Sequence, residues 1–375
     1  MLCFTTGHTI PINLELPLNM PRWIDEPIQH HAYSTVIGHQ IWISFNTYIY
    51  GEKDRNNFFV FDTKTHEMTD LTCKLPAIPN FSTSNVASSE DKLYIFMKKI
   101  IRHITGPEPE CNHKIFKFDT KSLTYTFLFN LSSRNLLGPP QIIGNFMYCL
   151  ENGPRYIPAG PSFVRRIEVH KVIKIDLTGR NAVKSIELSP RHGEQYRQMF
   201  AKNSQLYLLS YFENKLVVST IDNDNPIIPL TKIQHDISVP ITKWFNDSVI
   251  RKSYPNGPTL FLNTFDFNIH QWNRQAIENP SNRFFKFEFK SAELIDDTLF
   301  AVAISTPCHD PDKNNCVVKV IEYELKPKLS SICLLRLVDH LLSDSDNEKV
   351  DRVLESLPIP MRRKLSNMLE WRISG

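Results

Sequence analysis

The segments Phe58-Phe-Val-Phe-Asp62 and Ile115-Phe-Lys-Phe-Asp119 each join a short apolar strand to an acidic residue at its end. In both segments the Asp is followed by Thr-Lys, a sequence typical of turns in which the carboxylate accepts backbone N–H groups. The acidic positions recur every 44 to 57 residues, and the related segments end at Asp176, Asp222, Asp266 and Glu322. A repeat of this length predicts a solenoid or a propeller.

A second type of strand precedes each of these segments, and it begins with a polar turn and ends with an apolar–aromatic or apolar pair. It occurs at 38–42, 90–94, 144–148, 203–207, 246–250 and 296–300. Both series keep the same order six times, which favours blades built from several short strands. The pattern resembles kelch blades, although the Gly-Gly doublet of that family is missing. We therefore expect an all-β fold, a six-bladed kelch-like β-propeller, over residues 1–326; a β-sandwich or barrel with irregular loops is the alternative.

The N-terminus offers the strand that would close the ring. The first repeat continues after Asp62 with a fourth strand at 66–76, whereas after Glu322 the chain soon reaches Pro327 and a helical pattern. Residues 9–17 alternate apolar and polar and end in Leu-Pro, as residues 75–76 do. We expect this N-terminal segment to be the outer strand of the last blade, which leaves only short protected edges.

The composition is that of an ordinary globular protein, with 41% hydrophobic and 22% charged residues in 375. A net charge of +3 is too small to indicate direct nucleic-acid binding. Seven cysteines without a paired framework predict free thiols in a reducing compartment. No signal peptide or membrane-spanning run is recognisable, so we expect a cytoplasmic protein with access to the nucleus.

The last residues, 327–375, have a different pattern. Leu329, Cys333 and Leu337 recur at spacings of four, which places them on one helical face. A second apolar stripe, at 350–357, ends at Leu357-Pro-Ile-Pro360, where proline breaks the helix and starts a third. Met361, Leu365 and Met368 form the apolar side of that third helix.

This tail resembles a SOCS box, the three-helix module that recruits elongin and cullin. In that family the first helix carries a Leu-x3-Cys-x3-aliphatic motif, which Leu329, Cys333 and Leu337 match. The resemblance implies that these residues bind elongin C in its complex with elongin B. A leucine anchor, a small cysteine one turn on and a further apolar residue suit close helix docking. The alternative is that the tail helices pack on the propeller itself.

The cullin box of the family follows the second helix, and here it corresponds to Leu357, Pro358, Ile359, Pro360, Met361 and Leu365. Leu-Pro-Ile-Pro matches the start of the cullin 5 type, but Arg363 stands where that type has an apolar residue. Leu357, Pro358, Met361 and Leu365 fit the cullin 2 type, which we favour.

The resemblance implies a non-catalytic substrate-recognition subunit of a ubiquitin ligase, without a cofactor. Size and tail are compatible with zinc-finger-interacting SOCS-box receptors, which would imply CCCH zinc-finger proteins as targets. The main alternative is a propeller scaffold without a ligase role. A propeller hydrolase is a remote alternative, since no catalytic motif is present. Cys308, His309 and Cys316, or Cys111 and His113, could suggest zinc, but each lacks a second ligand pair.

The target is expected on the rim formed by the loops between second and third strands, such as 98–114, 151–168 and 251–259, and by the interblade segment 188–197. Arg and Tyr are frequent interface anchors. The candidate target-binding residues are Arg155, Tyr156, Arg165, Arg166, Arg191, His192, Arg251 and Tyr254, with Tyr196 in the same interblade segment.

Overall fold

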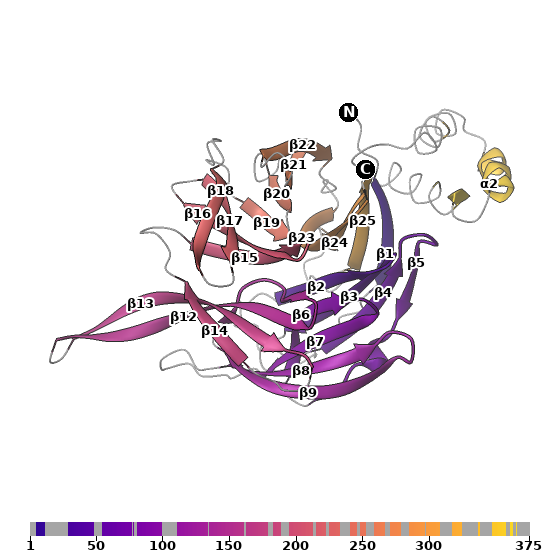
Figure 1. Cartoon of the computed structure of the whole chain (residues 1–375). Helices are drawn as coiled ribbons and strands as arrows, with labels where there is room; N and C mark the ends of the chain where they lie inside the picture. Colours follow the sequence, from indigo (N-terminus) through magenta and orange to yellow (C-terminus); the bar gives the residue numbers. More distant parts are fainter. Residues whose placement is uncertain are drawn as a thin grey trace, which may run out of the picture.

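The computed structural model is all-β in the described residues up to 324, apart from a short 3₁₀ turn (Figure 1). The residues that the structure describes are 5–11, 29–48, 55–76, 78, 81–99, 111–133, 135–160, 163–178, 183–188, 195–212, 215–222, 225–232, 241–245, 248–252, 259–266, 271–278, 285–296, 298–307, 317–324, 337, 347–357, 361, 362 and 365.

Within these residues the strands form six antiparallel sheets, which take up a propeller arrangement. The first sheet contains β2 (Gln29–Ile37), β3 (Gln40–Tyr48), β4 (Arg55–Asp62) and β5 (Glu67–Asp70), in that order. A 3₁₀ turn, Thr72–Lys74, follows β5. The second sheet contains β6 (Phe81–Ser89), β7 (Lys92–Lys99), β8 (Cys111–Asp119) and β9 (Thr124–Ser133).

The third sheet has a divided inner strand, β10 (Asn135–Leu136) and β11 (Gln141–Ile143), and both parts pair with β12. Its other strands are β12 (Phe146–Gly160), β13 (Phe163–Asp176) and β14 (Val183–Leu188). The fourth sheet contains β15 (Gln195–Lys202), β16 (Gln205–Phe212), β17 (Lys215–Asp222) and β18 (Asn225–Lys232). The fifth contains β19 (Ile241–Phe245), β20 (Ser248–Lys252), β21 (Thr259–Asp266) and β22 (Gln271–Glu278).

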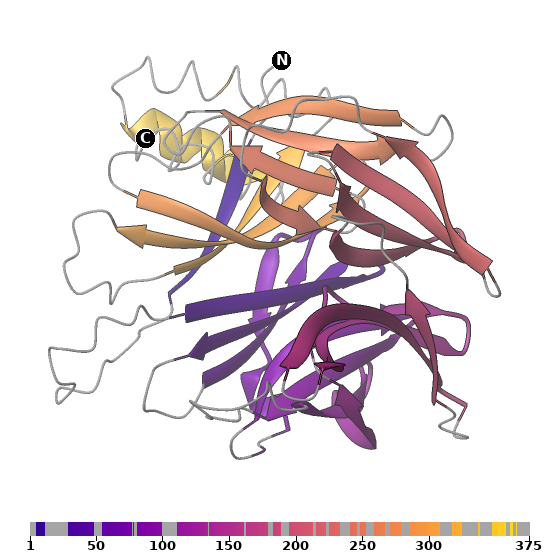
Figure 2. The same cartoon turned by 90° about the vertical axis from the view of Figure 1, so that its left-hand side faces the viewer.

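The last sheet combines the two ends of the β region. Its order is β23 (Phe285–Ile295), β24 (Thr298–Pro307), β25 (Val317–Glu324) and β1 (Thr5–Pro11). β1 runs antiparallel to β25, with Thr9 opposite Lys319, and Figure 2 shows this indigo strand among the orange strands. The N-terminal strand is therefore the outer strand of the last sheet, as expected, but it begins earlier than predicted, and residues 12–17 lie outside the described residues.

Neighbouring sheets pack through their first strands. β2 lies against both β6 and β23, β11 lies against both β6 and β15, and β19 lies against β23. Between the sheets, consecutive residues of one strand belong to different cores. On β3, for example, Trp42 faces the second sheet, whereas Ile41 and Ile43 face the last sheet. Because side chains alternate between the faces of a strand, this requires sheets that are apolar on both faces.

The predicted repeat of strands is confirmed for five segments, whereas the sixth acidic residue, Glu322, lies within β25, which ends at Glu324. The acidic segments are third strands, since β4, β8, β13, β17 and β21 all end at the expected Asp. The turn function of this residue is confirmed as well. Asp62 Oδ1 accepts the backbone N–H of Lys64 at 2.9 Å and of Thr65 at 3.0 Å, and Asp119 accepts those of Lys121 and Ser122 at 3.0 and 2.8 Å. These bonds lower the pKa of both carboxyls below the ordinary value.

Two segments differ from the prediction. The fourth strand expected at 66–76 is only Glu67–Asp70, since the chain turns into the 3₁₀ segment after it. The predicted rim loops are also shorter than expected, because strands extend into them: β12 and β13 take up most of 151–168, and β7 and β8 take up both ends of 98–114. Paired backbone groups replace a free loop in these places.

An aromatic group joins the first two sheets and should be the most sensitive part of the core. Phe58 is 0% exposed, and its ring lies 5.8 Å from that of Trp42 and 5.6 Å from that of Phe118. We expect Phe58→Ala to lower the free energy of unfolding by about 3–5 kcal/mol, because it leaves a cavity between the sheets. Chemical denaturation measures this loss.

Val183→Ala is the matched control, because Val183 lies on an outer strand and is 53% exposed. Its cost should stay within about 0.5 kcal/mol. Equal stability of the two variants would show that the packing between the first two sheets does not hold the fold.

Candidate functional site

The predicted elongin-binding and cullin-binding residues are described in part. Leu337 is helical and half-buried, Leu357 lies in a bend and is half-buried, and Met361 is helical and half-buried. Leu365 is helical and 0% exposed. The remaining members of both boxes, Leu329, Cys333, Pro358, Ile359 and Pro360, lie outside the described residues.

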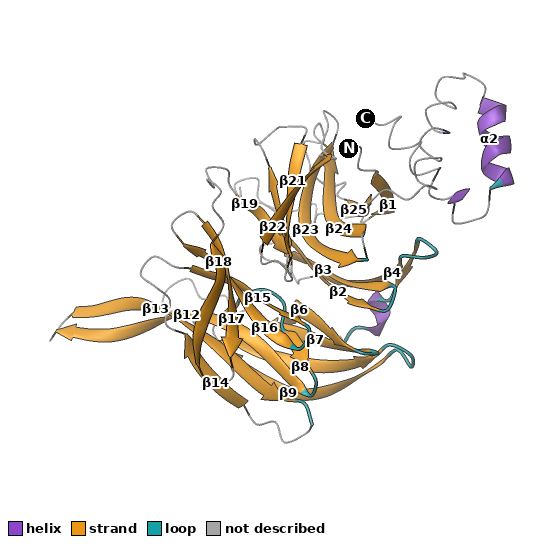
Figure 3. Cartoon of the chain, turned by 45° about the horizontal axis from the view of Figure 1, so that its top comes forward, coloured by secondary structure: helices purple, strands orange, loops and turns teal. Residues whose placement is uncertain are grey.

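The second helix of the tail is present as α2 (Asn347–Ser356), which stands beside the sheets near β1 and β25 (Figure 3). It ends one residue before Leu357, where the Leu-Pro-Ile-Pro segment predicts a break. The Leu357 N–H donates to the Leu354 carbonyl at 3.2 Å. Arg362 Nη2 donates to the Glu355 carbonyl at 2.7 Å, so a cation satisfies the carbonyl end of the helix. This bond also fixes the start of the next segment to α2.

Four of the candidate target-binding residues lie on the hairpin of β12 and β13. In its register Tyr156 is opposite Arg166, Ile157 opposite Arg165 and Arg155 opposite Ile167. Figure 1 shows this two-stranded ribbon projecting beyond the neighbouring sheets. The structure thus brings all four residues onto one projecting element.

The structure does not bring the other candidate target-binding residues together with these four. Arg251 is in β20, opposite Ile241 and Phe261. Arg191, His192 and Tyr254 lie outside the described residues. Tyr196 is only 3% exposed, and its ring meets that of His170 edge-on at 5.1 Å, so it is part of the core and not of a binding rim.

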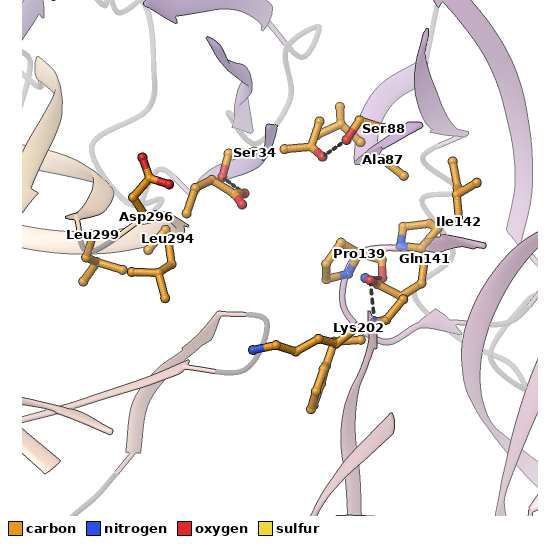
Figure 4. Close-up of a pocket in the computed structure, with 17 residues that line it drawn as sticks. Ser34, Ala87, Ser88, Pro139, Gln141, Ile142, Lys202, Leu294, Asp296 and Leu299 are labelled. Atoms are coloured by element: carbon orange, nitrogen blue, oxygen red, sulfur yellow. Dashed lines mark hydrogen bonds between the residues drawn. The ribbon is translucent and has the colours of Figure 1, made fainter. Parts of the chain in front are cut away.

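A cavity of about 440 Å³, which the sequence patterns did not predict, lies between the first strands of five sheets (Figure 4). Five first strands contribute to it: β2, β6, β11, β15 and β23. Its polar lining residues are Ser34, Thr35, Ser88, Gln141, Lys202, Glu293 and Asp296. Its volume is in the range of ligand sites, about 300–1,000 Å³. Polar residues near the ends of several first strands, such as Ser88 in β6 and Glu293 in β23, were the signal that could have indicated it.

The cavity wall is held by hydrogen bonds between sheets. Ser34 Oγ donates to Glu293 Oε1 at 2.7 Å, which joins the first and last sheets. Thr35 and Ser88 share a hydroxyl–hydroxyl bond of 2.7 Å between the first and second sheets. Gln141 Oε1 accepts the Ala201 N–H at 3.0 Å between the third and fourth. These bonds fix the positions of the polar groups around the cavity.

The described residues contain no group of three or more His, Cys, Asp or Glu side chains that could hold a metal. His113, one of the residues considered for zinc, is 2% exposed, and its Nδ1 lies 3.2 Å from Ser84 Oγ. Cys111 begins β8, while Cys308, His309 and Cys316 lie outside the described residues. Cys149 is a buried free thiol whose pKa is raised by burial, so it is unreactive.

The comparisons leave the family of the chain undefined. No family model matches it, and no curated protein matches it. Among the described residues no helix is long and apolar enough to cross a membrane. The class that the structure defines is a β-propeller arrangement, and a propeller suits a scaffold for protein–protein interactions.

His113 predicts a dependence of stability on pH. Burial, with a smaller contribution from Lys98, lowers its pKa from 6.5 to about 4. Between these values the unfolded chain binds a proton that the folded chain does not, so the free energy of unfolding falls as the pH falls from 6.5 to 4. The loss should reach about 3 kcal/mol. Denaturation at a series of pH values measures it.

His113→Gln should remove this part of the pH dependence, since an amide does not titrate. His39→Gln is the matched control, because His39 is partly exposed and bonded to Asp62 at 3.1 Å. A wild-type slope between pH 6.5 and 4 in His113→Gln would refute the assignment.

Proposed function

We propose that the chain is the substrate-recognition subunit of an elongin–cullin ubiquitin ligase, in which the propeller holds a target protein and the C-terminal tail docks the ligase. The observation that carries the proposal is the order of two boxes in the tail. Leu329, Cys333 and Leu337 recur at helical spacing, and Leu357-Pro358 follows a second helix.

The described part of the tail supports this order. Leu337 is helical and keeps part of its surface exposed, as a docking residue requires. α2 ends at Ser356, directly before the Leu357-Pro358 pair of the proposed cullin box. Apolar side chains on one helical face bind well in a partner groove, because each anchor buries its area at one place. Elongin C, with elongin B, is the proposed occupant.

Cullin 2 is the proposed cullin. Leu357 and Met361 are both half-buried, so both have surface left for a partner. Leu365 is fully buried, which limits it to packing within the tail and its surroundings. Arg363 puts a charge where the cullin 5 type has an apolar residue, and burial of that charge in an interface is costly.

The proposal includes a closed ring of six blades. The last and first sheets share a buried cluster that includes Ile43, Phe61 and Val320. His66 Nδ1 also lies 3.6 Å from Glu322 Oε2, from the β4–β5 turn to β25. A closed ring also requires contact between the fourth sheet and the fifth. Closure would leave no first strand without a neighbour on either side.

The target is proposed to bind the hairpin of β12 and β13, with Arg155, Tyr156, Arg165 and Arg166 as anchors. A projecting ribbon reaches a partner without movement of the ring, and Arg and Tyr offer broad contacts with polar ends. CCCH zinc-finger proteins are the proposed targets, on the basis of the resemblance of the tail.

The complete burial of Leu365 favours a second candidate function, a propeller scaffold without a ligase role. In that case the tail helices serve to cover the molecule's own surface. Elongin binding separates the two functions.

The elongin box is tested with the double variant Leu329→Glu, Cys333→Gln. Loss of the anchor and the close-packing residue should reduce copurified elongin C about tenfold or more, because charged and bulky groups do not fit an apolar groove. The measurement is the ratio of elongin C to the chain after coexpression with elongins B and C.

The double variant Leu357→Ala, Pro358→Ala is the matched control from the same tail. It should retain elongin C but lose cullin 2. Undiminished elongin C in the Leu329, Cys333 variant leaves the scaffold function as the better account. A preference of the wild-type chain for cullin 5 would refute the choice of cullin.

The target surface is tested with Arg165→Glu, Arg166→Glu, which reverses two charges on the hairpin. We expect the half-life of a coexpressed CCCH zinc-finger target to lengthen several-fold, because like or unpaired charges oppose binding. A chase after translation arrest measures it, and elongin binding should persist.

Lys184→Glu is the matched control, since Lys184 is exposed on β14 of the same sheet. It changes charge opposite Lys174, away from the projecting end of the hairpin. If the target is degraded as fast in the Arg165, Arg166 variant as in this control, the hairpin is not the receptor surface.

A further inference from the structure

The cavity inside the ring lies toward the opposite end of the sheets from the hairpin. Its lining residues come from the last part of the first strands, such as Ser88 near the end of β6 and Lys202 at the end of β15. The turns from first to second strands are at that end. Because antiparallel strands alternate in direction, the connections from second to third strands, including the tip of β12 and β13, are at the other end.

The hydroxyl groups of the wall use their hydrogens within the protein. Ser34 Oγ donates to Glu293, and Ser88 Oγ donates to the Val36 carbonyl at 2.9 Å. A hydroxyl has one hydrogen, so Thr35 is the donor in its bond with Ser88. These three groups therefore have only acceptor capacity left for a ligand.

The Gln141 amide is engaged in part, with one of its two Nε2 hydrogens left over. Its Nε2 donates to the Pro139 carbonyl at 3.0 Å, and its Oε1 accepts the Ala201 N–H. Two carboxylates, those of Glu293 and Asp296, add negative charge to the wall. Lys202 is the one Lys or Arg among the lining residues within the described part of the chain, and its side chain extends into the cavity in Figure 4.

This chemistry favours a ligand that brings donors and positive charge. Lysine and arginine side chains carry three and five N–H donors and no acceptor. Their aliphatic stems suit the apolar part of the lining, which includes Pro139, Phe200 and Leu299. A carboxylate ligand would instead face Glu293 and Asp296 with the same sign of charge.

We propose that the cavity binds a lysine or arginine side chain from an extended segment of a partner protein. The basic group lies against the acceptors of β2, β6 and the β23–β24 turn. Lys202, on the other side, faces a carbonyl or an acidic side chain next to the basic residue. That this segment belongs to a degradation target rests on the proposed function, whereas the binding itself does not.

The test is a selection of displayed random decapeptides on the full chain, copurified with elongins B and C. Selected peptides are then synthesised with a fluorescent label, and their affinity is measured by anisotropy. We expect the peptides to share a lysine or arginine, and its replacement by Gln to weaken binding about tenfold or more. Asp296→Asn should weaken binding similarly, because it removes a charge that faces the basic group.

Asp296→Asn suits this test because the residue has φ of 52°, which Asn tolerates well. Glu90→Gln is the matched control: Glu90 has φ of 53° in the corresponding turn between β6 and β7, but does not line the cavity. Ser34→Ala is a second variant, which removes the bond to Glu293. Thermal unfolding of each variant checks that it is folded.

Three outcomes would overturn the proposal: no peptide that binds, peptides with a shared acidic anchor, or basic peptides that bind Asp296→Asn and Ser34→Ala as tightly as wild type. Elongin C is measured in the same preparations. Its absence with intact peptide binding refutes the ligase function and leaves the cavity site. Its presence with no basic peptide refutes the cavity site alone.

Discussion

The packing of apolar sheets on both faces is the constraint on which the rest of this structure depends. On β7, Leu93, Ile95 and Met97 belong to the core shared with the first sheet, whereas Tyr94 and Phe96 belong to the core shared with the third. A sheet of this kind is stable only between two neighbours, because either face would otherwise expose large apolar side chains to water. Repetition of the same requirement from sheet to sheet leads to a propeller arrangement rather than a two-layer sandwich.

This constraint explains why the strands and their order could be predicted from the sequence. Each third strand needs aromatic or aliphatic residues on both faces and a turn at its end, which produces the Phe58-Phe-Val-Phe-Asp62 pattern. Asp62 and Asp119 bind backbone N–H groups only two and three residues away, so local sequence is sufficient to define these turns. The pairing of β1 with β25 was also predictable, because a missing fourth strand must be supplied from elsewhere in the chain.

The length of the hairpin and the presence of the cavity could not be predicted in the same way. The segment 151–168 has Pro154, Pro158 and polar residues, which favour a loop, yet pairing between β12 and β13 continues to Gly160 and Phe163. Long pairing beyond the ring depends on the partner strand, and local propensity does not report it. The cavity depends on which residues of five separate strands meet, and no spacing within one strand defines that. The boxes of the tail stay a prediction from residues that are close in sequence.

The two proposed sites would differ in the physical basis of their selectivity. The end of the hairpin projects beyond the neighbouring sheets and is formed by β12 and β13 alone. The cavity groups are held by bonds between sheets, such as Ser34–Glu293 and Gln141–Ala201, so their positions are fixed before binding. Preorganised acceptors favour one chemical group over others, whereas a projecting ribbon contributes mainly contact area. Since the two sites lie toward opposite ends of the sheets, one extended partner segment would have to pass along the ring to reach both. Two separate parts of a partner, or two partners, are therefore the simpler arrangement for simultaneous occupation.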